Sequence, residues 1–461
     1  MKKIKIISFG FIALLFASCV NLLDQEPESE YSFETFYTKP AHAKAGVNGI
    51  YTQLQSVMRI NFAYWGEGRA DNVRIKHTGE PAYLHENQLT STISTADWTS
   101  LYTLISNANY AIKYIPRVYD TESSEGNNLI GQARALRALA YFYLVRVWGD
   151  VPLILEPYTS ANQDFFVSRT DKNLVLDEIE KDLIFATQNC VEKNGNAVSD
   201  RATITKGGAY GILTQVYMWR KKYSEAITAA DQVIGNSLYT LPTSMPEWSK
   251  IFTTSYQSES VFEVGYNDTQ TNQLRVLFAI GNDAIYTPSE NLRNSFESGD
   301  LRQEYIYDVS LPLSSWGSMW KYLGKDVSDE DKSPSKQSII IVRLADIIML
   351  KAEALLATNA DKNAALALLT PIRERAGLAP LDQATAVAKY GSVENAILHE
   401  RRIELCFEGH RWFDLVRTGK AISTMGAITG ISSEDNIVWP ISQTSLDKNQ
   451  NLTQNTYYGG K

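Results

Sequence analysis

Residues 127–153 read NNLIGQARALRALAYFYLVRVWGDVPL. Apolar side chains, among them Leu136 and Leu139, recur in this stretch at intervals of three and four residues, which is the period of an amphipathic α-helix. Gly149 and Pro152 are expected to end the helix, because both residues interrupt helical backbone. The stretch therefore predicts a long helix that turns one apolar face toward a protein core.

Five further stretches have the same helical period. They cover residues 41–58, 97–118, 172–191, 203–219 and 223–234. A short turn joins the last two, and their spacing is that of a tetratricopeptide hairpin. A second hairpin of this kind is predicted near the C-terminal end, over residues 342–375. Helical repeats bury their apolar faces only by stacking. We therefore predict a mostly α-helical fold built on a tetratricopeptide-like helical-repeat scaffold.

The stretch from about residue 238 to 341 differs in composition. Pro, Gly, Ser and Asn interrupt short aromatic or β-branched runs such as SVFEV at 260–264, and no long helix is evident. We expect a large irregular insert of loops and short strands here. Loops on a rigid scaffold carry binding residues disproportionately, so this insert and the loop region 66–95 are predicted to present a ligand site.

The N-terminus predicts the compartment. Three lysines precede an apolar run over residues 6–17, which is shorter than the roughly 20 residues that a membrane-spanning helix needs. The run ends in LFASC, which resembles a bacterial lipoprotein signal cleaved before Cys19. We expect residues 1–18 to be a signal peptide, residues 19–40 to be the lipidated cysteine with its tether, and residues 41–461 to be a single body. An ordinary signal peptide with an incidental cysteine is the alternative.

Charge and aromatic content bear on the ligand. Forty-four Lys and Arg against 52 Asp and Glu give a net charge of −8, which would repel a phosphate backbone, so we expect no nucleic-acid partner. Aromatic residues make up 11% of the chain. Aromatic faces pack well on the apolar face of a sugar ring, so this composition suits a protein that binds sugars.

Motifs of catalysis and cofactor binding are absent from the sequence. It contains no G-x-S-x-G, H-E-x-x-H, Walker loop or dinucleotide fingerprint, and the acidic run at 326–331 lacks the features of an EF-hand loop. We therefore expect no enzyme activity, no cofactor and no metal. A glycosidase, which needs only two suitably spaced carboxylates, stays as a minor alternative. Cys190 and Cys406 are expected to be buried side chains, and a disulfide between them is left open.

The densest group of charges lies at residues 400–415, which read ERRIELCFEGHRWFDL. At helical pitch Arg401 and Glu404, or Arg411 and Asp414, lie three residues apart and could pair. We interpret this stretch as structural: a bent helix held to its neighbours by partly buried arginine–carboxylate pairs.

Several blocks along nearly the whole chain, taken in order, resemble the SusD/RagB family of Bacteroidetes outer-membrane nutrient-binding lipoproteins. These blocks are Cys19 followed by LDQEP at 23–27, the helix and stop at 133–153, RLAD at 343–346 with IRERAGL at 372–378, the stretch 400–420, and WPI at 439–441 with NLTQN at 451–455. The resemblance implies a cell-surface lipoprotein of the outer membrane that sits as a lid on a SusC-like TonB-dependent transporter. It would capture oligosaccharides, or peptides in RagB-like members, for uptake. A tetratricopeptide adaptor that binds a protein tail is a remaining alternative.

Tryptophans are the candidates for stacking on a sugar. Five of them have core spacing or apolar surroundings and are expected to pack inside: Trp148, Trp219, Trp248, Trp412 and Trp439. The other four are the candidate ligand contacts: Trp65, Trp98, Trp316 and Trp320. Arg69 and Asp71 follow Trp65 and could bond to sugar hydroxyls. For each of the four tryptophans, packing in the core is the alternative.

Overall fold

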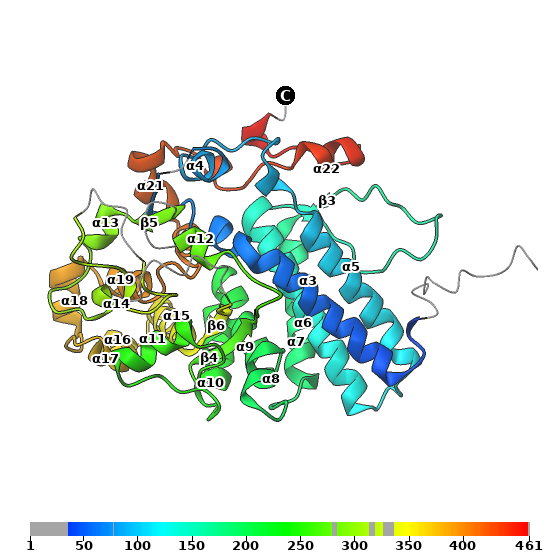
Figure 1. The fold of residues 1–461 in the computed structure, drawn as a ribbon, viewed down its shortest axis with the longest axis horizontal. Coiled ribbons are helices and arrows are strands. Elements are labelled where there is room, and N and C mark those ends of the chain that lie inside the picture. The colour runs from blue at the N-terminus through cyan, green and yellow to red at the C-terminus, as the bar shows by residue number, and fades with distance from the viewer. Residues whose placement is uncertain (1–35, 77, 279–283, 313–318, 326–335, 460–461) are drawn as a thin grey trace, which may run out of the picture.

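A computed structural model of the chain describes residues 36–76, 78–278, 284–312, 319–325 and 336–459. Helices dominate this part of the chain, and its strands form three short pairs (Figure 1). The prediction of a mostly α-helical fold is confirmed. None of the helices in these ranges is both long and apolar enough to cross a bilayer.

The N-terminal half is a stack of long helices. Its members are α3 (Pro40–Gly66), α5 (Thr99–Tyr114), α6 (Ser124–Trp148), α7 (Lys172–Asn189), α9 (Lys206–Trp219) and α10 (Tyr223–Ile234). Each of these helices packs against the next of them along the chain, and α10 packs in turn against α15 (Leu344–Ala357). The stack of hairpins is therefore continuous from the N-terminal half into the C-terminal half.

Helix α6 runs through the middle of the stack. The side chain of Ser123 caps its start by accepting a hydrogen bond from the backbone of Gly126, and Gly149 ends it at a φ of +79°, which favours glycine. Every residue from 135 to 148 is buried. Two sides are covered by α5 and α7, and a third by the C-terminal segment around Trp439, whose backbone N–H donates to the carbonyl of residue 147 at 2.7 Å. The sequence predicted that this helix buries one apolar face, but the structure buries it on at least three sides.

The second predicted hairpin differs from a simple pair of helices. Its first helix is α15, which follows strand β6 (Ile339–Arg343). The second is split into α16 (Lys362–Ala367) and α17 (Thr370–Arg375). The break falls where Pro371 occupies the first turn of α17, and a proline there cannot continue the hydrogen bonding of the preceding helix.

The insert is joined to the scaffold by two short sheets. It holds α11 (Met245–Thr253), β4 (Ser260–Val264), α12 (Leu274–Phe278), β5 (Tyr286–Pro288), α13 (Glu290–Arg293) and α14 (Arg302–Ile306). Strand β4 pairs antiparallel with β6, and β5 pairs antiparallel with β1 (Val73–Ile75). No long helix occurs among the described residues of the insert, in agreement with its composition.

The C-terminal part completes the body. It consists of α18 (Gln383–Tyr390), α19 (Val393–Glu404), α20 (Arg411–Arg417), α21 (Ala421–Thr429), the 3-10 helix η4 (Glu434–Asn436), α22 (Gln443–Lys448) and the 3-10 helix η5 (Thr456–Tyr458). The remaining short elements are α4 (Glu80–His85), η1 (Ser94–Ala96), η2 (Ile115–Arg117), β2 (Val151–Pro152), β3 (Arg169–Thr170) and α8 (Ala197–Ala202), with β2 and β3 paired antiparallel. Between α19 and α20 the chain turns sharply, with positive φ at Phe407 and Gly409, so the predicted bent helix is two helices.

The charged stretch around this turn is structural, but its partners differ from those predicted. Arg401 pairs with Asp414 at 3.1 Å and with Asp346 at 2.8 Å. Arg411 pairs with Asp71 at 2.8 Å. The predicted i,i+3 pairs of Arg401 with Glu404 and of Arg411 with Asp414 were wrong, because these side chains point into the interior and meet residues from other elements.

The core contains most of the tryptophan and cysteine side chains that were predicted to lie in it. Four of the five tryptophans expected inside are buried: Trp148, Trp248, Trp412 and Trp439. Cys190 and Cys406 are also buried, as predicted, and both are free thiols, so no disulfide joins them. The acidic run at 326–331 lies outside the described residues, and within the described ranges no group of three or more His, Cys, Asp and Glu side chains is placed to hold a metal ion.

Candidate ligand-binding site

The predicted contacts Trp65 and Trp98 lie in the core. Their side chains are 1% and 5% exposed. Each ring packs edge-on against Trp148, with a centroid distance of 5.8 Å in both cases. Rings held in this way present no face to a ligand, so the prediction of direct contact is corrected to core packing.

Arg69 and Asp71 are buried ties between the end of α3 and the C-terminal part. Arg69 lies over the ring of Trp412 at 4.3 Å and donates to the backbone carbonyl of Ile437 at 2.6 Å. Asp71 accepts a hydrogen bond from the guanidinium of Arg411. Burial would raise the pKa of Asp71, but the adjacent guanidinium groups hold it below its usual range. Both side chains are buried and bonded to other parts of the protein, Arg69 through its terminal nitrogens and Asp71 through both carboxylate oxygens, so the structure places neither at a surface where a sugar could reach it.

The last two candidates lie in the insert. Trp320 is largely buried at 9% exposure, and its backbone N–H donates to the carbonyl of Ile306 at 2.8 Å. Trp316 lies outside the described residues. Within the described ranges, therefore, none of the tryptophans that were predicted to contact a ligand has a ring face open to one.

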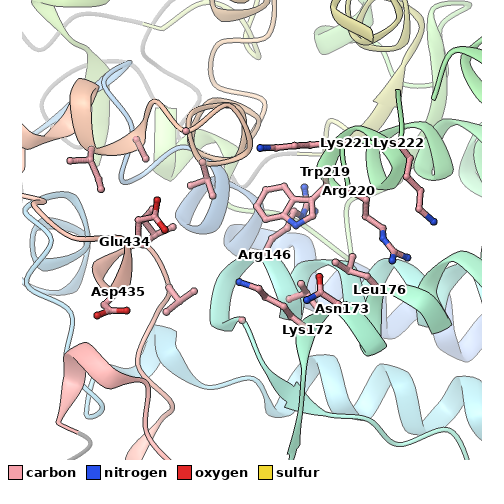
Figure 2. A pocket seen from close by; sticks show the side chains of 18 residues that line it. Arg146, Lys172, Asn173, Leu176, Trp219, Arg220, Lys221, Lys222, Glu434 and Asp435 are labelled. Carbon is pink, nitrogen blue, oxygen red and sulfur yellow. The ribbon is translucent and has the colours of Figure 1, made fainter. Parts of the chain in front are cut away.

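A cavity of about 630 Å³ lies elsewhere, between the helical stack and the C-terminal part (Figure 2). One wall is formed by α6, the start of α7 and the turn from α9 to α10. The opposite wall is formed by the end of α20, the start of α21, and η4 with the segment that follows it. Two parts of the chain that are far apart in sequence therefore enclose it.

Trp219, the last residue of α9, lines this cavity. Its ring packs edge-on against Phe142 and Phe413, with centroid distances of 6.2 Å and 6.4 Å. These contacts fix the indole but leave it only partly buried, and Figure 2 shows it on the wall that also carries Arg146 and Lys172. The sequence predicted that Trp219 packs inside, because helical spacing identifies the face of a helix that meets the next helix. It could not show that part of the same ring stays open to a cavity.

Arg146 is a buried cation on the same wall. It is 9% exposed, and its guanidinium lies 4.0 Å from the ring centroids of both Phe142 and Phe413. Its Nε donates to the carbonyl of Phe142 at 3.2 Å. Burial lowers its pKa to about 10, so the group is still charged at neutral pH. Among the described residues no carboxylate forms an ion pair with it.

Four more cations line this wall, and they fall into two pairs. Arg220 and Lys222 are neutralised by Glu180, at 2.6 Å and 2.7 Å. Lys172 and Lys221 are exposed and form no ion pair with any described residue. Figure 2 shows both of these lysines extending toward the opposite wall.

The opposite wall is acidic. Glu434 and Asp435 form the first two residues of η4 and line the cavity. Both are exposed, and neither forms an ion pair within the described part of the chain. The cavity thus combines one fixed indole, unpaired cations on one side and unpaired carboxylates on the other. Such a site can hold a flat apolar face and bond to polar groups on both sides of it.

The comparisons with known proteins agree with this fold. A model described as the SusD family matches residues 314–458, and one described as starch-binding associating with outer membrane matches residues 21–218. The chain is 32% identical to SusD-like protein P38 of Formosa agariphila, over 99% of this chain and 100% of that protein. It is 25% identical to a SusD-like protein of Bacteroides ovatus, over 90% of this chain and 82% of that protein.

Solved structures are similar as well. A laminarin binding SusD-like protein superimposes with a TM-score of 0.78 at 24% identity, covering 91% of this chain and 100% of that one. A SusD superfamily protein from Bacteroides thetaiotaomicron superimposes with a TM-score of 0.78 at 24% identity, covering 92% and 99%. At this identity the likeness establishes a shared fold.

Proposed function

The chain belongs to the SusD family, and on that premise we propose that it binds an oligosaccharide at the cell surface and passes it to a SusC-like TonB-dependent transporter. The family is described as starch-binding and associated with the outer membrane, which supports a glycan ligand and a location at that membrane. One of the structurally similar proteins binds laminarin, which is a glycan. In this proposal the protein carries its ligand and breaks no bond in it.

The cavity beside Trp219 is the proposed binding site. Sugar-binding sites combine an aromatic face for the C–H side of the ring with polar side chains for its hydroxyls. The half-buried indole of Trp219, with Lys172 on its own wall and Glu434 on the opposite one, has this combination. The volume of about 630 Å³ lies within the roughly 300–1,000 Å³ typical of small-molecule sites. The fixed indole in a polar cavity is the observation that carries the proposal.

Membrane attachment is proposed through Cys19. The sequence LFASC at its N-terminal side has the small residues that precede a lipidated cysteine, and residues 19–40 would form the tether. Lipid chains contribute about 0.8 kcal/mol for each buried methylene, which suffices to anchor a protein that has several of them. The body would then stay at the outer membrane, next to the transporter.

Peptide uptake is the second candidate. The unpaired cations and carboxylates on opposite walls could receive the two charged ends of a short peptide, as well as the polar groups of a sugar. A binding measurement with both classes of ligand separates the two candidates.

We predict that Trp219→Leu weakens glycan binding about tenfold, because the loss of a stacking face costs ~1–2 kcal/mol. The measurement is calorimetric titration of the full-length protein in detergent with an oligosaccharide chosen from a printed array of glycans and peptides. Phe165→Ala is the matched control, since that ring is 49% exposed and does not line the cavity.

Mass spectrometry of the recovered ligand completes this test. The oligosaccharide should return at its original length. Release of new reducing ends would contradict a pure binding role, and an array on which only peptides bind would favour the second candidate.

A further inference from the structure

Three cations from different elements converge on the cavity without a carboxylate partner. They are Arg146 in α6, Lys172 at the start of α7, and Lys221 in the turn from α9 to α10. The contrast with their neighbours is sharp. Arg220 and Lys222 flank Lys221 in the chain, and both are neutralised by Glu180. Glu180 therefore neutralises the two neighbours of Lys221 but not Lys221 itself. The three cations without a carboxylate partner all line the cavity.

The position of Arg146 adds a second, independent observation. A buried charge is costly unless an opposite charge or several hydrogen bonds compensate it. The bonds of Arg146 go to two neutral groups, the carbonyl of Phe142 and the hydroxyl of Tyr143. Aromatic rings cover its guanidinium plane, so the edge with its remaining N–H donors is the part left for a partner.

Acids near Arg146 are already in use. Asp346 and Asp414 act on Arg146 electrostatically, and both form ion pairs with Arg401, at 2.8 Å and 3.1 Å. Arg146 lines both this cavity and a smaller one of about 30 Å³ that it shares with Asp346 and Asp414, so an anion in the larger cavity would be an additional partner for the guanidinium. Because the chain as a whole carries a net charge of −8, this cationic wall is a local feature that long-range charge does not explain.

From this arrangement we infer that the ligand is an anionic oligosaccharide, whose carboxylate or sulfate groups bind the wall of Arg146, Lys172 and Lys221. The inference rests on the proposed function and names its substrate class. The acidic groups would face this wall, and sugar hydroxyls would donate to Glu434 and Asp435 opposite. The indole of Trp219 would support the ring between them. A neutral glycan would leave the cations unpaired, and a sugar with its acidic groups on both faces would be repelled by the second wall.

The test rests on a pair of ligands with the same sugar backbone, one charged and one neutral, and two further oligosaccharides extend it. Short oligogalacturonate carries a carboxylate on each ring, and its methyl ester has the same backbone without the charge. A sulfated carrageenan oligosaccharide distinguishes sulfate from carboxylate, and a laminarin oligosaccharide represents neutral glycans. Affinities for the full-length protein are measured by calorimetric titration at low and at high salt.

The variant is Lys172→Ala combined with Lys221→Ala. Its control is Lys362→Ala combined with Lys448→Ala, which removes the same charge from exposed positions that do not line the cavity. We expect at least one acidic oligosaccharide to bind tenfold or more tightly than the neutral ligands, and more weakly as salt rises. The first variant should lose about tenfold for the acidic ligand and keep its affinity for the neutral ones, and the control should match wild type.

The outcomes separate the inference from the function on which it rests. Preference for the sulfated or for the carboxylated ligand identifies the acidic group. Equal binding of acidic and neutral glycans, with no effect of the Lys172/Lys221 variant, would overturn the inference and leave glycan binding intact. Binding of none of these four oligosaccharides, together with binding of peptides alone on the array of glycans and peptides, would overturn both.

Discussion

Gly66 is the residue at which α3 meets the turn between α19 and α20. A Cβ at this position would lie 1.8 Å from the carbonyl oxygen of Gly409, which is a backbone atom and cannot rotate away. Gly66→Ala is therefore expected to lower the free energy of unfolding by about 3 kcal/mol. Equilibrium unfolding in urea, followed by circular dichroism, measures this loss.

The same helix provides the control. A Cβ at Gly49 would meet no atom within 4 Å. Gly49→Ala should raise the free energy of unfolding by up to about 1 kcal/mol, because alanine favours helical backbone. Similar losses at Gly49 and Gly66 would show that helix propensity, and not the close approach to Gly409, determines the effect.

Glu263 in β4 is a buried carboxylate without an ion pair among the described residues. Its Oε1 accepts from the backbone N–H of Tyr256, and burial raises its pKa to about 8. The folded protein thus keeps a proton that the unfolded chain releases above its ordinary pKa of about 4.5. The free energy of unfolding should therefore fall as pH rises from about 5 to about 8.

Glu263→Gln isolates this effect, because glutamine keeps the acceptor and cannot ionise. The variant should be more stable than wild type at about pH 8, by an amount of the order of a few kcal/mol, and the difference should shrink toward about pH 5. Urea unfolding of both proteins across this pH range is the measurement. Parallel stability curves for the two proteins would contradict the raised pKa.

At the residue scale, the sequence predicted which tryptophans lie in the core better than it predicted which residues line the cavity. Trp148 and Trp412 could be placed inside because helical spacing reports packing. The same argument placed Trp219 in the core. Part of its ring does pack on Phe142 and Phe413, but the ring also lines the cavity. Phe413 is far from Trp219 in the chain, so only the folded structure brings the two rings together.

At the element scale, a buried ion network attaches α19 to the rest of the body. Glu404 accepts from Arg343 at 2.9 Å and from Arg375 at 2.7 Å, and these side chains are at most 1% exposed. Burial would raise the pKa of Glu404, but the surrounding guanidinium groups hold it well below its usual range. Arg343 also pairs with Glu259 and with Glu408. This single arginine therefore joins β6 to α19 and to the turn after it.

We predict that Arg343→Ala lowers the free energy of unfolding by about 3–5 kcal/mol, because it removes the cation that Glu259, Glu404 and Glu408 share and leaves three buried carboxylates with fewer opposite charges. Lys181→Ala is the control, since its pair with Glu178 lies at the surface of α7 and should contribute less than about 1 kcal/mol. Urea unfolding measures both variants. Equal small losses would contradict the view that the network fixes α19 in place.

The helical period predicted the elements well where a helix packs along its whole length, as in α5, α7 and α9. It failed where a local break intervenes. Pro371 splits the second predicted hairpin, and positive φ at Phe407 and Gly409 separates α19 from α20. Pairing partners were also missed, because a buried arginine such as Arg401 meets carboxylates from other elements and not those one turn away.

At the scale of the whole molecule, the stack of hairpins from α3 to α15 is the rigid frame on which the proposed site depends. One wall of the cavity belongs to this stack and the other to the C-terminal part. Figure 1 shows C-terminal segments, coloured orange to red, running across one end of the stack. The period of the helices predicted the frame. It contained no information on how the segment at 434–438 folds back, because that contact joins distant parts of the chain.

The most direct test of the proposed binding role is a crystal structure of the full-length protein with the oligosaccharide that binds it most tightly on the array. We predict an intact sugar chain with one ring against the indole of Trp219 and its polar groups between Lys172 and Glu434. An oligosaccharide bound elsewhere, with this cavity empty, would contradict the proposal, and so would a cleaved one.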